Sequence, residues 1–387
     1  MATGKALNGK PYAGNPHVRF DEGEVALAAT PRRGSLLYSP AKGYQFIFRP
    51  TMSCNLGCAY CYAATLRDGA PKMMSEEEAR LCIDWMVRFC QYHEIEGASI
   101  LWHGGEPLLP GVDFFAKTLE YAKCCFELVG IHLTNQIQTN LLLVTDRHVE
   151  LFKEYFGGSV GFSWDYGSNL RMYPNGKNAS DDIWEKALWC KSQGLRIGAL
   201  CQITPENRMR PREIYRHFSK AGIPFRLGPL FPCSMEDALL AAETSCGVID
   251  AWFDDVSPKI EVGNFRELVE ALLTGEHRKC YAEQNCGRVL LALSPGGEIY
   301  PCSRTVNKED VIGNFLADEP NVIHDRRIGF YGDKDISECL SCECKNACAG
   351  GCPFHVKTGW HECECAYNRK VIGHLSNWLR KAGYDCV

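Results

Sequence analysis

Short apolar runs alternate with amphipathic stretches from about residue 44 to residue 230. The first apolar run, 44–49, reads as a buried strand. Ser75 and Glu78 form a capping box, and apolar residues then recur at helical spacing. The whole pattern predicts strands at 44–49, 98–103, 132–138, 159–164, 195–203 and 224–230, with helices after 75 and near 112–128, 145–155, 180–193 and 211–221. Such a strand–helix alternation predicts an α/β fold whose parallel sheet is curled into a partial, TIM-like (β/α)6 barrel.

The segments outside this alternation differ in composition. Gly, Pro and short polar turns dominate residues 1–42, and the pattern turns helical over 239–274. Beyond 277 the chain breaks into short cysteine-spaced pieces with a hairpin at Ser294-Pro295-Gly296-Gly297, and a final helix is expected near 367–381. Because these pieces carry few apolar residues, metal ligation must supply much of their folding energy. The predicted domains are an arm or cap (1–42), the barrel (43–235), a helical bridge (236–278) and a small cysteine-rich domain (279–387).

The net charge and the hydropathy of the chain limit the kinds of binding partner that we expect. The chain has 45% hydrophobic and 23% charged residues and a net charge of -5. That balance gives no electrostatic reason to expect a nucleic acid or an anionic membrane. No apolar stretch approaches the roughly 18 residues that span a bilayer. We therefore expect neither partner.

Cysteine is the most over-represented residue, with 22 in 387 positions. A secreted disulfide framework is one explanation, but the first residues lack an apolar signal region and such scaffolds are usually much shorter. We expect a reducing, cytoplasmic setting in which thiolates are kept for metal. Cys82, Cys90, Cys190 and Cys201 lie in predicted helices and strands and are expected to be small core residues.

Three cysteines follow the first predicted strand, in the segment Cys54-Asn-Leu-Gly-Cys58-Ala-Tyr-Cys61. Their spacing can hold a [4Fe-4S] cluster at three corners, which leaves one iron open to bind a reactant. A structural zinc site with a fourth ligand elsewhere is the alternative, although zinc cysteines usually come as two C-x2-C pairs. In barrels of parallel strands the chemistry gathers at the carboxyl ends of the strands, where this segment lies.

These residues resemble the radical SAM superfamily, whose cysteine triplet has this spacing. The resemblance implies that the open iron is chelated by S-adenosylmethionine and that electron transfer to the sulfonium frees a 5'-deoxyadenosyl radical. The segment Gly104-Gly105-Glu106-Pro107, after the second strand, is similar to the family's GGEP motif. There, glycines would let a ligand's ammonium group approach the backbone.

Further strand ends resemble cofactor-contacting segments of the family, although Leu141 replaces a glycine that often follows the third strand. His103 either contacts the cofactor region or fills the barrel. The resemblance implies that the cofactor-binding residues are Tyr60, Gly104, Gly105, Glu106, Pro107, Gln138, Asn140, Ser163, Asp165 and Arg171.

The C-terminal cysteines resemble the SPASM extension of the superfamily, beginning with Gly297-x4-Cys302. The resemblance implies two auxiliary [4Fe-4S] clusters, and three clusters in all. Cys280, Cys286, Cys302 and Cys352 would hold the first, and Cys339, Cys342, Cys348 and Cys365 the second, with Cys363 as a rival to Cys365. Cys344 matches no family position.

Within the superfamily, the segments 49–56 and 104–109 are similar to anaerobic sulfatase-maturating enzymes and related peptide-modifying maturases. One departure matters: the sulfatase maturases carry an aspartate base directly after the third auxiliary cysteine, where this chain has Ser303. A serine takes up no proton near neutral pH unless another base activates it. Candidates for an acid or base are Asp165, Tyr166 and Ser303.

The leading hypothesis is an enzyme that abstracts hydrogen from a residue of a peptide or protein and then oxidises or crosslinks it, as in the maturation of ribosomally made peptides. An external electron donor such as flavodoxin or ferredoxin would supply electrons. Sulfatase maturation and radical dehydrogenation of a small molecule are alternatives within enzymes. A non-catalytic iron–sulfur electron carrier is an alternative of another class, but it would need neither an open iron nor the GGEP segment.

Overall fold

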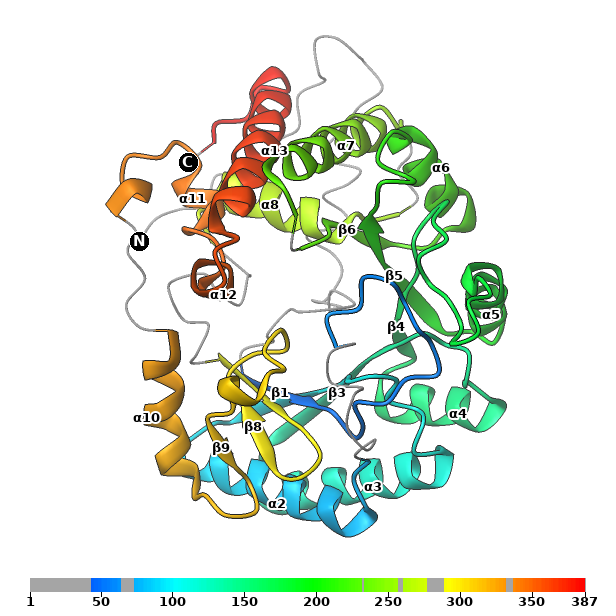
Figure 1. Cartoon of the computed structure of the whole chain (residues 1–387), viewed down its shortest axis with the longest axis vertical. Helices are drawn as coiled ribbons and strands as arrows, with labels where there is room; N and C mark the ends of the chain where they lie inside the picture. The colour runs from blue at the N-terminus through cyan, green and yellow to red at the C-terminus, as the bar shows by residue number, and fades with distance from the viewer. Residues whose placement is uncertain are drawn as a thin grey trace.

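A curved parallel sheet forms the centre of the molecule (Figure 1). The structure is a computed structural model, and it describes residues 43–63, 73–231, 233–256, 260–276, 289–331 and 337–386. Neighbouring strands of the barrel pair in parallel and in chain order: β1 (Tyr44–Phe48), β2 (Gly97–Trp102), β3 (His132–Thr139), β4 (Ser159–Ser163), β5 (Arg196–Ile203) and β6 (Phe225–Pro229). The predicted partial barrel is confirmed. The arm predicted at 1–42 lies outside the described residues.

Helices cover the outer face of the curved sheet: α2 (Glu76–Tyr92), α3 (Val112–Leu128), α4 (Asp146–Tyr155), α5 (Ser180–Ser192) and α6 (Pro211–Ala221). The Ser75 side chain caps α2 by accepting a hydrogen bond from the Glu78 N–H at 3.0 Å. Cys82 and Cys90 of α2 are fully buried, as predicted, and burial raises the pKa of Cys90 to about 12. Both cysteines are therefore inert core residues.

The predicted helical segment 239–274 is two helices, α7 (Met235–Phe253) and α8 (Gly263–Thr274). The predicted hairpin is formed by β7 (Leu290–Leu293) and β8 (Glu298–Tyr300), and β9 (Gly313–Asn314) pairs with β8. The sequence did not indicate where this hairpin docks: β7 pairs in parallel with β1. Within the described residues the sheet therefore has nine strands, in the order β6-β5-β4-β3-β2-β1-β7-β8-β9.

The remaining elements are short, apart from two helices. They are η3 (Lys308–Asp310), α10 (Pro320–Tyr331), η4 (Ser337–Cys339), α11 (Lys345–Cys348), α12 (Pro353–Lys357) and α13 (His361–Lys381). Helix α13 lies along α7, where Tyr367 meets Ser245 (O···O 2.8 Å) and Trp378 Nε1 donates to Asp250 (2.7 Å). It begins at His361, earlier than predicted, so its first two turns include Cys363 and Cys365. Among the described residues, no helix is both long and apolar enough to cross a membrane.

Candidate active site

The loop that carries the cysteine triplet is held against the Gly-Gly turn after β2. Gly105 N–H donates to Thr51 O at 3.0 Å, and Glu106 N–H donates to Ser53 O at 2.8 Å. A Cβ at Gly104, whose φ is +118°, would lie 2.3 Å from Thr51 O, and one at Gly105 would lie 2.0 Å from Ser53 O. No side chain fits at either position. The two glycines are therefore needed to bring the triplet loop onto the end of β2.

Glu106 is buried and clamps the ends of β2 and β3 together. Its carboxylate accepts hydrogen bonds from Thr139 Oγ1 (2.7 Å), Asn140 N–H (2.8 Å) and Leu108 N–H (3.1 Å). Burial raises the pKa of Glu106 to about 7, and the three hydrogen bonds oppose that rise. Pro107, next in the chain, is also buried. The GGEP segment thus fixes the geometry of the neighbouring strand end.

The residue that Glu106 holds, Asn140, reaches the triplet loop. Its side-chain amide donates to Asn55 Oδ1 at 2.6 Å and lies 3.9 Å from Cys54 Sγ. A second contact joins the next pair of strands: Gln138 Nε2, near the end of β3, donates to Ser163 Oγ, at the end of β4, at 2.6 Å. These sequence-predicted residues therefore lie side by side at the carboxyl edge of the sheet.

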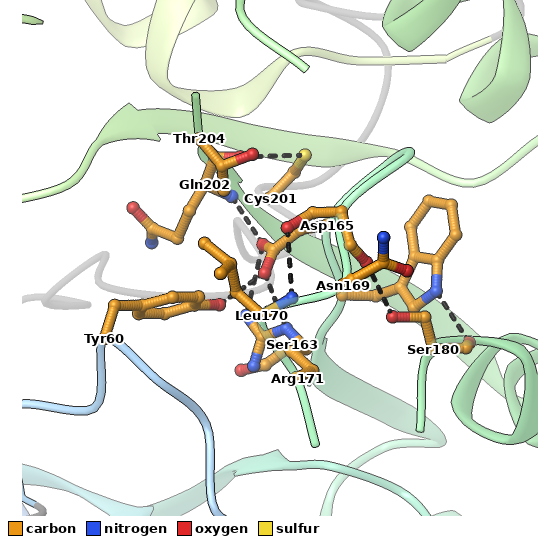
Figure 2. Close-up of polar contacts among 12 residues, drawn as sticks. Tyr60, Ser163, Asp165, Asn169, Leu170, Arg171, Ser180, Cys201, Gln202 and Thr204 are labelled. Atoms are coloured by element: carbon orange, nitrogen blue, oxygen red, sulfur yellow. Dashed lines mark hydrogen bonds and ion pairs between the residues drawn. The ribbon is translucent and has the colours of Figure 1, made fainter. Parts of the chain in front are cut away.

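Asp165, after β4, is the centre of a buried polar cluster (Figure 2). It pairs with Arg171 (Nε···Oδ2 2.8 Å), accepts the Gln202 N–H of β5 at 2.7 Å, and accepts a hydrogen bond from Tyr60 OH. The Arg171 guanidinium also lies 5.4 Å from the centre of the Tyr60 ring. Burial raises the pKa of Tyr60 well above its usual value, although the Arg171 charge opposes this. Tyr60, Asp165 and Arg171 are thus brought together.

The loop after β4 also runs beside the triplet. Gly57 N–H donates to Met172 O at 2.6 Å, and Ala59 N–H donates to Leu170 O at 2.9 Å. Cys54, Cys58 and Cys61 are partly exposed at this edge. Burial raises the pKa of Cys58, while the Arg171 charge lowers it. Accessible thiols beside a fixed guanidinium and the Asn140 amide fit a cluster that keeps one iron open to a ligand.

Arg49, at the end of β1, is a site residue that the sequence reasoning missed. It is fully buried, and its guanidinium donates to the backbone oxygens of Ser303 (2.7 Å), Cys302 (3.2 Å) and Thr305 (3.2 Å). It also lies 5.3 Å from the centre of the Tyr300 ring. One signal in the sequence could have found it: an arginine directly after an apolar strand is expected to be buried. A buried guanidinium needs several acceptors close by. Arg49 ties the triplet loop to the loop that carries Cys302.

Two candidates for an acid or base, and His103, lie apart from the Asp165 cluster. Tyr166 faces α6, where its OH lies 3.1 Å from Glu213 Oε2 and 3.0 Å from Arg210 Nη2. Ser303 is buried beside Arg49. His103 Nδ1 accepts the Gly104 N–H at 2.7 Å, and burial together with the Arg49 charge lowers the pKa of His103 to about 4. Acid–base roles for Asp165, Tyr166 and Ser303 stay predictions.

A second group of cysteines lines one cavity in the C-terminal region. Among the described residues the lining of this cavity includes five thiols, together with the charged or polar residues Lys345, His361, Glu364, Asn368 and Arg369; the thiols are those of Cys339, Cys342, Cys344, Cys348 and Cys365. Cys363 instead donates its thiol to Cys233 O at 3.4 Å. Side chains two positions apart on a helix point about 200° apart, so Cys363 and Cys365 cannot both face the cavity. The geometry favours Cys365 over Cys363 for the second auxiliary site.

The first auxiliary site is only partly described. Cys302 and Cys352 are both buried, whereas Cys280 and Cys286 lie outside the described residues. Within the described ranges, no three His, Cys, Asp or Glu side chains are grouped so as to hold a single metal ion. The four-cysteine set stays a prediction.

Comparison with known proteins places this geometry in context. A family model for the radical SAM superfamily matches residues 48–218. The chain is 26% identical over 382 residues to the serine-type anaerobic sulfatase-maturating enzyme of Klebsiella aerogenes, covering 94% of this chain and 91% of the relative. It is 23% identical over 337 residues to the cysteine-type enzyme of Clostridium perfringens, covering 79% of this chain and 88% of the relative.

Solved structures share the fold. The chain resembles anSMEcpe with bound AdoMet and the Cp18Cys peptide at a TM-score of 0.72 and 20% identity, covering 87% of this chain and 98% of that one. It resembles Streptococcus suis SuiB bound to the precursor peptide SuiA at a TM-score of 0.54 and 18% identity, covering 92% and 82%. The likeness therefore runs through the barrel and into the cysteine-rich C-terminal region.

Proposed function

Since the chain belongs to the radical SAM superfamily, as its motifs predicted, we propose that it abstracts a hydrogen atom from a residue of a peptide or protein. The chemistry would come from S-adenosylmethionine and a [4Fe-4S] cluster at Cys54, Cys58 and Cys61. One observation carries the proposal: Glu106, Asn140 and the Asp165–Arg171 pair, from the ends of β2, β3 and β4, are fixed around the triplet loop, whose Tyr60 bonds to Asp165. A carrier of electrons alone would need no such enclosure.

The residues at this edge of the sheet would each bind a different part of the cofactor. Gly104 and Gly105 let the triplet loop pack directly on the end of β2, and by resemblance to the family's GGEP motif the cofactor's ammonium group would bind at this turn. Arg171 supplies positive charge beside Cys58, which suits a carboxylate or a ribose oxygen. Asp165 keeps Arg171 in place and offsets part of the cost of burying its charge. The edge is therefore suited to a zwitterionic, nucleoside-bearing cofactor.

Two further clusters would be held by the C-terminal cysteines and would accept the electron that oxidation of a substrate radical releases. Arg49 joins the triplet loop directly to the backbone around Cys302, and the hairpin that ends near Cys302 extends the barrel sheet at β1. Both ligand loops are thus anchored on one strand. That arrangement supports electron exchange between the active edge and the C-terminal region. An external donor such as flavodoxin or ferredoxin would supply electrons to the protein.

Oxidation or crosslinking of a peptide fits this chain better than sulfatase maturation. The relatives named as sulfatase-maturating enzymes match over nearly the whole chain, and this keeps sulfatase maturation as the second candidate. At the position of their aspartate base, however, the chain has Ser303, beside the buried cation Arg49. A cation at this place also lowers the proton affinity of any base beside it. Chemistry that needs a strong base there is therefore disfavoured.

The radical claim is tested by anaerobic reconstitution with iron and sulfide, followed by S-adenosylmethionine and dithionite. We expect 5'-deoxyadenosine to accumulate with the native chain and not with a variant in which Cys54, Cys58 and Cys61 are all alanine. Cys124→Ser, a change at an exposed thiol on α3, is the control. Absence of 5'-deoxyadenosine from the native chain would end the proposal.

The peptide claim needs a substrate readout. Candidate precursor peptides and a cysteine- or serine-containing sulfatase peptide are incubated with the active protein and examined by mass spectrometry. Loss of two hydrogens with a new internal linkage in the fragmentation pattern supports crosslinking. Formylglycine in the sulfatase peptide would instead establish the second candidate.

A further inference from the structure

A carboxylate, Glu364, is buried between the two groups of candidate auxiliary ligands. It lies in the first turn of α13, between Cys363 and Cys365, and only 7% of the residue is exposed. It also lines the cavity formed by Cys339, Cys342, Cys344, Cys348 and Cys365. A buried carboxylate is costly unless it is paired and hydrogen-bonded, so its partners indicate what it does.

The first partner of Glu364 is the backbone of Cys352, a candidate ligand of the other auxiliary site. Cys352 N–H donates to Glu364 Oε2 at 2.8 Å. The approach depends on Gly351: a Cβ there would lie 2.8 Å from the same oxygen, and its φ of +75° favours glycine. The chain therefore keeps room for this carboxylate next to a cysteine ligand.

The second partner is His355, whose exposed fraction is 1% and whose Nδ1 lies 3.1 Å from Glu364 Oε2. The other ring nitrogen of His355 contacts the Arg304 guanidinium, and Arg304 N–H lies 3.4 Å from Cys302 Sγ. Because a guanidinium only donates, the ring nitrogen that it meets must accept, which leaves Nδ1 to carry the ring proton. Arg304, His355 and Glu364 thus form a continuous line from Cys302 to Cys352.

The charge of Glu364 also bears on the second cavity. A negative charge in the wall of a low-dielectric site disfavours the added electron of a reduced cluster, so it lowers the reduction potential. Groups that orient metal ligands through hydrogen bonds affect both the retention of the metal and its redox properties. A residue that orients a ligand of one cluster and places its charge beside the other would influence the reduction potentials of both clusters.

We propose that Glu364 is a positioning residue that couples the two auxiliary sites: it holds the Cys352 ligand of one and places its negative charge in the wall of the other. The proposal rests on the auxiliary clusters of the proposed function. His355, whose Nδ1 lies 3.1 Å from the same carboxylate oxygen, is the second contact of Glu364.

The test uses the full chain with Cys54, Cys58 and Cys61 changed to alanine, so that only auxiliary clusters contribute signals. Glu364→Gln removes the charge, and Glu364→Asp keeps it on a shorter side chain. Glu362→Gln is the matched control, because Glu362 is exposed on the same turn of α13. Iron and sulfide per chain are measured, and midpoint potentials are obtained by redox titration followed by electron paramagnetic resonance.

We expect Glu364→Gln to raise the midpoint potential of an auxiliary cluster at native iron content, with Glu364→Asp nearer to the native value and Glu362→Gln unchanged. If Glu364→Gln loses auxiliary iron, retention of that iron in Glu364→Asp supports the positioning role. Native potentials in Glu364→Gln, or equal loss of iron in both Glu364 variants, would overturn it. A native chain that binds no auxiliary iron would overturn both this proposal and the auxiliary clusters of the proposed function. If the auxiliary clusters are intact but no 5'-deoxyadenosine forms, only the radical claim fails.

Discussion

Arg49 Nη2 lies 2.7 Å from Ser303 O, although the two residues are 254 positions apart in the chain. The contact joins the end of β1, where the triplet loop begins, to the loop that carries Cys302. Arg49 is fully buried. Glu298, the acidic residue in the strands of the β7–β8 hairpin, accepts a hydrogen bond from Tyr300 OH and not from Arg49. The guanidinium is therefore held by carbonyl oxygens, so its loss would leave several buried acceptors without a donor.

Replacing Arg49 by lysine should destabilise the protein and loosen the Cys302 loop. An ammonium group cannot reproduce the planar fork that reaches Ser303, Cys302 and Thr305 together. We expect the free energy of unfolding to fall by about 3 kcal/mol, the scale of one or two charge-assisted hydrogen bonds. Anaerobic urea unfolding measures the change, and Arg88→Lys, at an exposed ion pair with Glu319, is the control. Equal stability of the two variants would contradict the anchoring role.

The Asp165–Arg171 pair should behave as a buried ion pair. Asp165→Asn leaves the Arg171 charge buried without its partner, and we expect the free energy of unfolding to fall by about 3 to 5 kcal/mol. Asp113→Asn, at the exposed pair with Arg147, should have little effect. Thermal or urea unfolding of both variants provides the measurement. A loss no larger than that of Asp113→Asn would show that the pair does not organise this edge.

The pH dependence of stability should carry the signature of Glu106. Its pKa is about 7 in the folded chain and 4.5 when unperturbed, so the folded state binds the proton more tightly. The free energy of unfolding should therefore decrease as pH rises from about 4.5 to about 7, by about 3 kcal/mol from this group alone, and level off above that range.

Because other groups titrate over the same range, the Glu106 contribution is obtained as a difference. Glu106→Gln cannot ionise, so the stability of the native chain relative to this variant should fall as pH rises from about 4.5 to about 7. Urea unfolding of both proteins at several pH values measures it. A difference that is independent of pH would mean that folding does not shift the pKa of Glu106.

The sequence predicted the parts of the fold that leave a periodic signal. The alternation of apolar runs and capped helices predicted the partial barrel, and the cysteine spacing with Gly104 and Gly105 predicted the family. The docking of β7 on β1 was not predictable, because a short apolar strand pairs equally well with any exposed sheet edge. Arg49 was missed for a similar reason: its acceptors are backbone carbonyls about 250 residues away, which leave no pattern in the sequence.

The choice between Cys363 and Cys365 required the start of α13. With the helix predicted from about 367, both cysteines would have preceded it in a loop, and either thiol could have reached the cavity lined by Cys339, Cys342 and Cys348. Since α13 begins at His361, the two side chains point to opposite sides of the helix, and Cys363 faces Cys233. Local propensity rarely fixes a helix boundary to within a few residues, and here those few residues determine which cysteine faces the cavity.

The two cysteines should consequently respond differently to the same substitution. Cys365 lines the cavity with Cys339, Cys342 and Cys348, so Cys365→Ser replaces a soft thiolate by a poorer ligand for iron and should lower the iron and sulfide bound per chain by up to one cluster. Cys363→Ser is nearly isosteric and keeps a donor for Cys233 O, so it should retain native iron. Iron and sulfide assays with electron paramagnetic resonance on both reconstituted variants provide the comparison. The reverse pattern, with iron lost from Cys363→Ser alone, would mean that the first turn of α13 rotates when the cluster binds.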